Sequence, residues 1–233
     1  MKIAHLLPMT LIDYPDRVAA LVFTPGCPFR CPFCHNAELV LPEKTAALPL
    51  IPENDLFYFL RERAGFLDAV VITGGEPTLH DDVSRVIRRV KQLGLLVKLD
   101  TNGSRPEVLE ALLDEGLLDY VAMDVKAPLE RYSELCGTPV DREAIRRSID
   151  LIIKRAPDYE FRTTAAPTIT AADVRAIADL IGGAKRYILQ PFVVPAGKDL
   201  VDPVWRDKPA LSQSALRAVW TEVQDRFEDG GVR

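Results

Sequence analysis

Three cysteines lie within eight positions of the sequence, in the segment Cys27-Pro-Phe-Arg-Cys31-Pro-Phe-Cys34. Prolines within the segment keep it out of regular secondary structure. Three thiolates that converge from one loop can hold a soft metal ion or three irons of an iron–sulfur cube. His35 could complete a Cys₃His zinc site, or the fourth iron of a cluster could stay open for a substrate. The spacing matches neither the common zinc patterns nor the ferredoxin run, so it leaves zinc and cluster equally open.

Polar motifs follow three further predicted strands, each directly after the strand. They are Gly74-Gly75-Glu76-Pro77, then Asp100-Thr101-Asn102-Gly103, and finally Asp124 with Lys126. In α/β barrels and open parallel sheets the active site lies at the carboxyl ends of the strands, so these motifs and the cysteine segment should face one mouth. Any one of them could be only a turn, but their repetition at the same end of successive strands favours a shared site.

Six short apolar runs alternate with stretches of helical periodicity, which is typical of βαβ units and a parallel sheet. The predicted strands are Val18–Phe23, Ala69–Ile72, Leu96–Leu99, Tyr120–Met123, Glu160–Thr164 and Tyr187–Leu189. An apolar stripe between Val83 and Leu93 has the spacing of a helix packed on that sheet. Six such units fit a partial (β/α)₆ TIM-like barrel, with the cysteine loop after the first strand, better than a closed barrel of about 250 residues. A flat doubly wound sheet is the competing fold.

The composition is that of an ordinary globular protein, with 233 residues, 48% hydrophobic, 27% charged and a formal net charge of −5. One domain over residues 1–233 is therefore expected. The acidic balance without a Lys/Arg block disfavours nucleic acid as a partner. Neither a membrane span nor a secretion signal is predicted, and clustered cysteines suit a reducing compartment, so we expect a cytoplasmic protein.

The cysteine pattern with Phe33 before its last member, followed by Gly74-Gly75-Glu76-Pro77, resembles the radical S-adenosylmethionine (radical SAM) superfamily. The finer resemblance is to activating enzymes of glycyl-radical proteins, in particular the activating proteins of anaerobic ribonucleoside-triphosphate reductase. It rests on the segments Thr10–Pro15, Cys34–Asn36, Leu99–Gly103, Met123–Pro128 and Glu160–Thr164. The resemblance extends from Met1 to about Phe192.

This resemblance implies an oxidoreductase with a [4Fe–4S] cluster and SAM as cofactors. Reductive cleavage of SAM would give methionine and a 5′-deoxyadenosyl radical, which would generate a glycyl radical on a large partner enzyme, foremost anaerobic ribonucleotide reductase. An electron donor such as flavodoxin or ferredoxin is implied as well. The alternatives are a radical SAM enzyme that acts on another protein or a small molecule, and a non-catalytic Cys₃His zinc interaction module.

The resemblance also implies roles for individual residues. The cluster ligands are Cys27, Cys31 and Cys34, and the cofactor contacts are Phe33, His35, Gly74, Gly75, Glu76, Asn102, Asp124, Lys126 and Arg162. Phe33 would lie by the adenine, and Lys126 and Arg162 could meet the SAM carboxylate. A monovalent cation would be held by Asp100, Thr101 and Asp124. Cys136 is expected to be a partly buried thiol, and the long loop Pro191–Pro209 has no assigned role.

Overall fold

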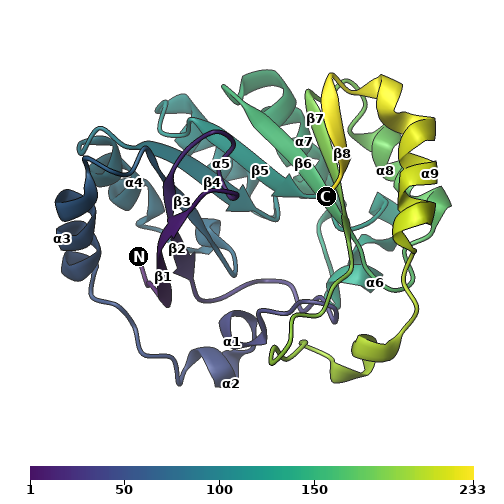
Figure 1. Ribbon diagram of the computed structural model, residues 1–233, viewed down its shortest axis with the longest axis horizontal. Helices are drawn as coiled ribbons and strands as arrows, with labels where there is room; N and C mark the ends of the chain where they lie inside the picture. The colour runs from purple at the N-terminus through teal and green to yellow at the C-terminus, as the bar shows by residue number, and fades with distance from the viewer.

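The computed structural model describes residues 1–233 and contains one eight-stranded sheet, curved into an open arch (Figure 1). The strands are β1 (His5–Thr10), β2 (Ala19–Thr24), β3 (Ala69–Gly74), β4 (Leu96–Thr101), β5 (Tyr120–Asp124), β6 (Tyr159–Ala165), β7 (Arg186–Pro191) and β8 (Asp229–Val232). Strands β2 to β8 are parallel to their neighbours, and β1 is antiparallel to β2. The order follows the chain from β1 to β8, and these two edge strands do not pair with each other.

The six predicted strands are confirmed as β2 to β7, each within two residues at either end. The strand order has no reversal, so the partial barrel is confirmed and the flat doubly wound sheet is wrong. The prediction missed β1, which contains Pro8, and β8, which contains Gly230-Gly231, because proline and glycine are poor strand formers. The cysteine loop therefore follows the second strand of the chain, which is the first of the parallel set.

Six helices of nine or more residues cover the convex face of the arch (Figure 1). They are α3 (Glu53–Arg63), α4 (Val83–Lys91), α5 (Pro106–Asp114), α7 (Arg142–Arg155), α8 (Ala171–Leu180) and α9 (Gln213–Val223). Helix α8 begins with a capping box between Thr170 and Asp173. The short helices are α1 (Ala37–Val40), α2 (Pro42–Thr45) and α6 (Tyr132–Cys136), with 3₁₀ turns η1 (Pro77–Leu79), η2 (Leu129–Arg131), η3 (Pro203–Asp207) and η4 (Gln224–Arg226). None of the helices is both long and apolar enough to cross a membrane.

Alternate residues of each strand face the two sides of the sheet, and the two sides differ in chemistry. On the convex side, residues such as Val70 and Ile72 join the helices in a core of 49 buried residues. On the concave side, a separate cluster of only seven buried residues, including Tyr14 and Tyr120, lies at the amino ends of the strands. Towards the carboxyl ends the concave side becomes polar, and this gradient places the polar side chains at the mouth.

Candidate functional site

A cavity of about 460 Å³ opens at the carboxyl ends of the strands, a volume typical of small-molecule sites. Every predicted site residue except Glu76 lines it: Cys27, Cys31, Phe33, Cys34, His35, Gly74, Gly75, Asp100, Thr101, Asn102, Asp124, Lys126 and Arg162. They come from the loop after β2 and from the ends of β3, β4, β5 and β6. The expectation that these separate motifs share one mouth is therefore confirmed.

The cysteine loop is held by hydrogen bonds to its own backbone and to α6. The Arg30 guanidinium donates from Nη1 to the carbonyl oxygens of Cys27, at 2.6 Å, and Phe29, at 2.7 Å. The Arg30 backbone N–H donates to the carbonyl of Cys136 at 2.8 Å. Asn102 Nδ2 lies 3.6 Å from Cys27 Sγ, so the amide can donate to this sulfur and orient it. These hydrogen bonds together fix the shape of the loop.

The three thiols of the loop are protonated at neutral pH in the absence of a metal. Burial raises the pKa of Cys27 to about 12, and burial also raises the pKa of Cys34. The pKa of Cys31 is raised first by contact with the thiol of Cys136 and then by burial. A metal that binds here must displace these protons, since the thiolate is the ligand. Cys136 itself is fully buried rather than partly buried as predicted.

The donor set of the loop suits a cluster better than a single ion. No group of three or more His, Cys, Asp or Glu side chains converges so that it could hold one metal ion. An iron–sulfur cube takes one thiolate on each iron, so its ligands do not have to meet at a point. Three thiols on the wall of one cavity therefore fit a cube, whereas the Cys₃His zinc alternative needs a tetrahedral arrangement that the chain lacks.

Gly74 and Gly75 allow the end of β3 to pack directly on the start of the cysteine loop. Gly74 has a φ of +118°, and a Cβ there would lie 2.4 Å from the backbone nitrogen of Thr24. A Cβ on Gly75 would lie 2.0 Å from the carbonyl oxygen of Gly26. Both residues also line the cavity, so any larger residue would displace the loop that carries Cys27.

The carboxylate of Glu76 is bonded within the fold and does not line the cavity, and its predicted contact with SAM stays a prediction. Its carboxylate is fully buried and accepts hydrogen bonds from Thr78 N at 3.1 Å and Thr78 Oγ1 at 2.6 Å. It also accepts from Thr101 Oγ1 at 2.8 Å and from Asn102 N at 2.7 Å. These four donors occupy the carboxylate and keep it away from the cavity. Glu76 therefore ties the end of β3 to the end of β4, which places Asn102 beside Cys27.

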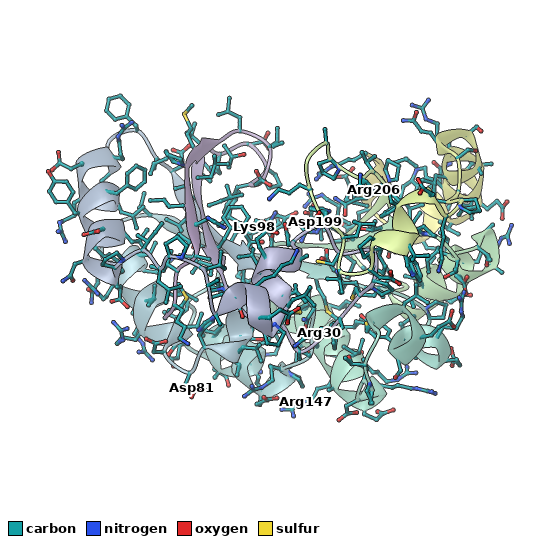
Figure 2. All side chains as sticks on the ribbon, turned by 90° about the horizontal axis from the view of Figure 1, so that it is seen from below. Arg30, Asp81, Lys98, Arg147, Asp199 and Arg206 are labelled. Atoms are coloured by element: carbon teal, nitrogen blue, oxygen red, sulfur yellow. The ribbon has the colours of Figure 1, made fainter.

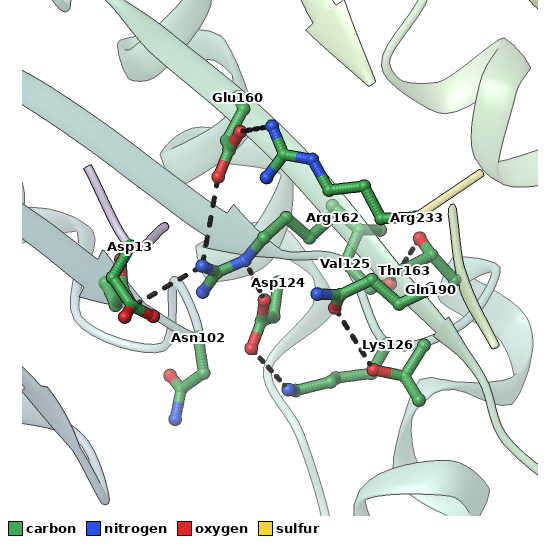
Figure 3. A network of polar contacts seen from close by, with 12 residues as sticks. Asp13, Asn102, Asp124, Val125, Lys126, Glu160, Arg162, Thr163, Gln190 and Arg233 are labelled. Atoms are coloured by element: carbon green, nitrogen blue, oxygen red, sulfur yellow. Dashed lines mark hydrogen bonds and ion pairs between the residues drawn. The ribbon is translucent and has the colours of Figure 1, made fainter. Parts of the chain in front are cut away.

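A chain of charges crosses the floor of the cavity (Figure 3). Asp124 accepts from Lys126 Nζ and from Arg162 Nε, both at 2.8 Å. Burial acts to raise the pKa of Asp124, but the charges of Arg162 and Lys126 outweigh it and hold this pKa well below its ordinary value. The same pairing raises the pKa of Lys126 against the effect of burial. All three groups are therefore charged at neutral pH.

The predicted ligands of a monovalent cation are not arranged around one point. Arg162 Nη1 lies 3.4 Å from Asp100 Oδ2, so its guanidinium already bridges Asp100 and Asp124. The Thr101 hydroxyl donates to Glu76 instead of facing the two carboxylates. The three side chains lie at the cavity as predicted, but arginine supplies the positive charge between them, and they do not fit a cation in this arrangement.

Sequence reasoning missed Lys98, whose Nζ lies 3.5 Å from Asp100 of the site, and one part of the cavity wall. Lys98, on β4, is only 2% exposed, donates to the carbonyl of Asp13 and lies 3.6 Å from Glu160. A lysine inside an apolar run gives no local sign of such burial, because its partners come from other elements. The cavity wall at the ends of β6 and β7 and just beyond β7 is formed by Thr164, Gln190, Phe192, Val193 and Pro195. Their position at or after the ends of predicted strands was the available signal.

The chain is similar in sequence to several known proteins. The family model that matches is the radical SAM superfamily, over residues 21–181. A protein of Methanocaldococcus jannaschii provisionally named a glycyl-radical enzyme activating enzyme is 35% identical over 221 residues, covering 92% of this chain and 88% of that protein. A PqqA peptide cyclase of Methylorubrum extorquens is 34% identical over 122 residues, 51% of this chain and 30% of the cyclase.

Solved structures are similar in fold. The crystal structure of Streptococcus suis SuiB bound to S-adenosylmethionine matches with a TM-score of 0.68 at 15% identity over 91% of this chain. The chain spans about half, 51%, of the length of that SuiB chain. At this identity the likeness concerns the fold alone.

Proposed function

This chain belongs to the radical SAM superfamily, and on that premise we propose that it is the activase of a glycyl-radical enzyme. The superfamily implies a [4Fe–4S] cluster and SAM as cofactors. The observation that carries the proposal is the gathering of three cysteines, two glycines and a half-buried Asp–Lys–Arg set around one cavity. The name of the Methanocaldococcus jannaschii relative supports the activase over other members of the superfamily.

We assign Cys27, Cys31 and Cys34 as the ligands of the cluster, and the glycines as the backbone wall beside SAM. Bound together, the reduced cluster and SAM supply an electron for cleavage of the sulfonium bond and a radical that removes a hydrogen atom. Asp124 keeps Lys126 charged and aimed into the cavity, where its ammonium can meet a carboxylate. Asn102 orients the sulfur of Cys27.

The open arch supports a protein as the target. Because β1 and β8 do not pair, the concave face is accessible from the side as well as from the mouth. The edge next to this opening exposes a run of large apolar side chains, namely Leu7, Met9, Leu11 and Ile12. Contiguous exposed apolar groups are typical of protein interaction sites. We infer that a large enzyme docks here and offers its glycine segment to the cavity.

The finer identity of the partners follows from the resemblance in the motifs. We propose anaerobic ribonucleoside-triphosphate reductase as the glycyl-radical enzyme and flavodoxin or ferredoxin as the electron donor. Neither nucleic acid nor a membrane is needed for this reaction, which we place in the cytoplasm. We also propose that residues 1–233 work as one radical SAM domain.

The test is to purify the chain without oxygen, assay iron, sulfide and zinc, and then reduce it with SAM present. About four irons per chain, with formation of methionine and 5′-deoxyadenosine, are expected. Addition of the reductase should then produce the electron paramagnetic resonance (EPR) signal of a glycyl radical. One zinc per chain, and no cleavage of SAM after reconstitution with iron and sulfide, would reject the proposal.

A second candidate is a radical SAM enzyme that modifies another peptide. It is favoured by the similarity to a PqqA peptide cyclase over 122 residues. The two candidates separate in the same experiment, because this second enzyme would cleave SAM but would not generate a glycyl radical on the reductase.

A further inference from the structure

The segment Pro191–Pro209, here called the strap, connects β7 to the last helix. On its way it passes the side of the cavity formed by the cysteine loop. Figure 1 shows it leaving the sheet, running down to the cysteine loop and to α1 and α2, and then returning to α9. Phe192, Val193 and Pro195 of the strap line the cavity. Figure 2 marks Asp199 and Arg206 on the strap and Arg30 on the cysteine loop. The strap is long for a connection, and so far no role accounts for it.

The strap is bonded to the cysteine loop through the backbone. The N–H of Val201 donates to the carbonyl of Cys34 at 2.9 Å, and the N–H of Asp202 donates to the carbonyl of Pro32 at 3.0 Å. Leu200, the residue before them, is only 2% exposed and belongs to the main core. Two backbone hydrogen bonds anchored by a buried side chain fix the end of the loop, where Phe33 and Cys34 lie.

An aromatic contact lies next to these bonds. The ring centroids of Trp205 and Phe33 are 6.1 Å apart with an interplanar angle of 42°, within the range of favourable aromatic pairs. Both rings are buried, but only Phe33 lines the cavity, so Trp205 supports it from behind. Trp205 is itself fixed in η3, whose first turn is capped by Asp202, and Lys208 Nζ lies 4.2 Å from its ring centroid.

Two ion pairs tie the strap to the short helices after the cysteine loop. Lys198 Nζ lies 2.7 Å from Glu38 on α1, and Asp199 lies 3.0 Å from Lys44 Nζ on α2. Exposed pairs of this kind contribute little free energy. The backbone bonds and the Trp205 contact therefore determine where the strap sits, and the ion pairs refine it.

We propose that Trp205 is a positioning residue for SAM, acting through Phe33. The strap holds Pro32 and Cys34 by the backbone, and Trp205 fixes the ring of Phe33 on the cavity wall, where it would contact the adenine. This inference rests on the proposed function, because it takes SAM as the ligand of the cavity. It predicts a division of labour in which cluster assembly depends on the cysteines and affinity for SAM depends on the strap.

The test uses the chain reconstituted with iron and sulfide. Trp205→Ala should bind SAM about tenfold more weakly, the upper range for loss of one aromatic pair, with unchanged iron content. Trp205→Phe keeps a ring behind Phe33 and should restore most of the affinity. The matched control is Trp220→Phe, since Trp220 packs between Tyr187 and Phe227 and does not line the cavity. Dissociation constants come from equilibrium dialysis with labelled SAM.

A second readout does not depend on how well Trp205→Ala folds. In the Trp220→Phe variant Trp205 is the only tryptophan left, so its fluorescence should change when SAM binds the reconstituted chain. Constant emission, or equal affinity of a folded Trp205→Ala variant and the wild type, would overturn the inference while leaving the proposed function intact. No binding of SAM by the wild type would overturn both.

Discussion

The convex and concave faces of the sheet are built from alternate residues of the same strands, yet they hold the molecule together in different ways. Val70 and Ile72 point to the convex side and meet helices, in a core that needs only apolar shape. Lys98 and Glu160 point to the concave side and meet charges from other strands. Apolar burial is non-directional, whereas a buried charge is tolerated only with a specific partner. The convex face therefore adds stability through apolar packing alone, whereas the concave face adds it only through specific charge partners and also sets what the cavity can bind.

Loss of one cysteine should give the largest difference between the two faces. Cys31→Ala is expected to abolish iron binding and SAM cleavage, because the cube loses one of three ligands, while thermal unfolding of the apoprotein changes little. Cys136→Ala is the control, since Cys136 is also buried but does not line the cavity. Iron and sulfide assays with circular dichroism decide the outcome, and a fully loaded Cys31→Ala chain would contradict the assigned ligands.

Removal of Lys98 should be the next largest effect. Lys98→Met leaves the buried carboxylate of Glu160 without one of its partners and is expected to cost about 3–5 kcal/mol of unfolding free energy. The double variant Lys98→Met/Glu160→Gln should recover part of this loss, because it also removes the buried charge that Lys98 compensates. Urea unfolding of the three proteins measures the coupling. Strictly additive losses would show that the two groups do not interact.

Truncation on the convex face should affect stability alone. Ile87, on α4, is fully buried in the main core, so Ile87→Ala is expected to cost about 2–5 kcal/mol. The iron content and SAM cleavage per folded chain should stay at the wild-type level, because the cavity is on the other side of the sheet. A variant that folds but cleaves SAM poorly would mean that the two faces are more strongly coupled than we describe.

The smallest effect concerns pH. The pKa of Asp124 is lowered in the folded protein from its ordinary value of 3.8. Its ion pairs therefore stabilise the fold fully at a pH above the pKa of the unfolded chain, and this stabilisation is lost as the pH falls through the pKa of the folded protein. The difference in unfolding free energy between wild type and Asp124→Asn should therefore be constant from pH 8 to pH 5 and shrink only below about pH 4. A difference that fades between pH 7 and pH 5 would argue against the lowered pKa.

The same contrast explains what the sequence could predict. Strands β2 to β7 and helix α4 could be predicted from apolar periodicity, because residues that pack into the convex core recur at regular spacing along the sequence. The motifs at the strand ends were placed correctly for a similar reason, since parallel strands deliver their carboxyl ends to one edge.

The surroundings of Glu76 and Trp205 could not be predicted, because their partners are distant in the chain. Glu76 is withdrawn from the cavity by Thr101 and Asn102, and Trp205 gains its role only because the strap returns to Phe33. No local pattern carries that information. The edge strands β1 and β8 were missed for a different reason. Pro8 in β1 and the glycines of β8 are locally unfavourable in strands, but both segments still pair with the neighbouring strand of the sheet.

The unpaired edges of the arch also have a mechanical consequence. In a closed barrel the number of strands and their stagger fix the radius. Here no ladder of hydrogen bonds joins β1 to β8, so the span between them is free to change through small adjustments of twist shared among seven strand pairs, with no bond broken. The width of the opening between β1 and β8 can therefore change by bending of the whole sheet, and a partner segment can enter the concave face in this way.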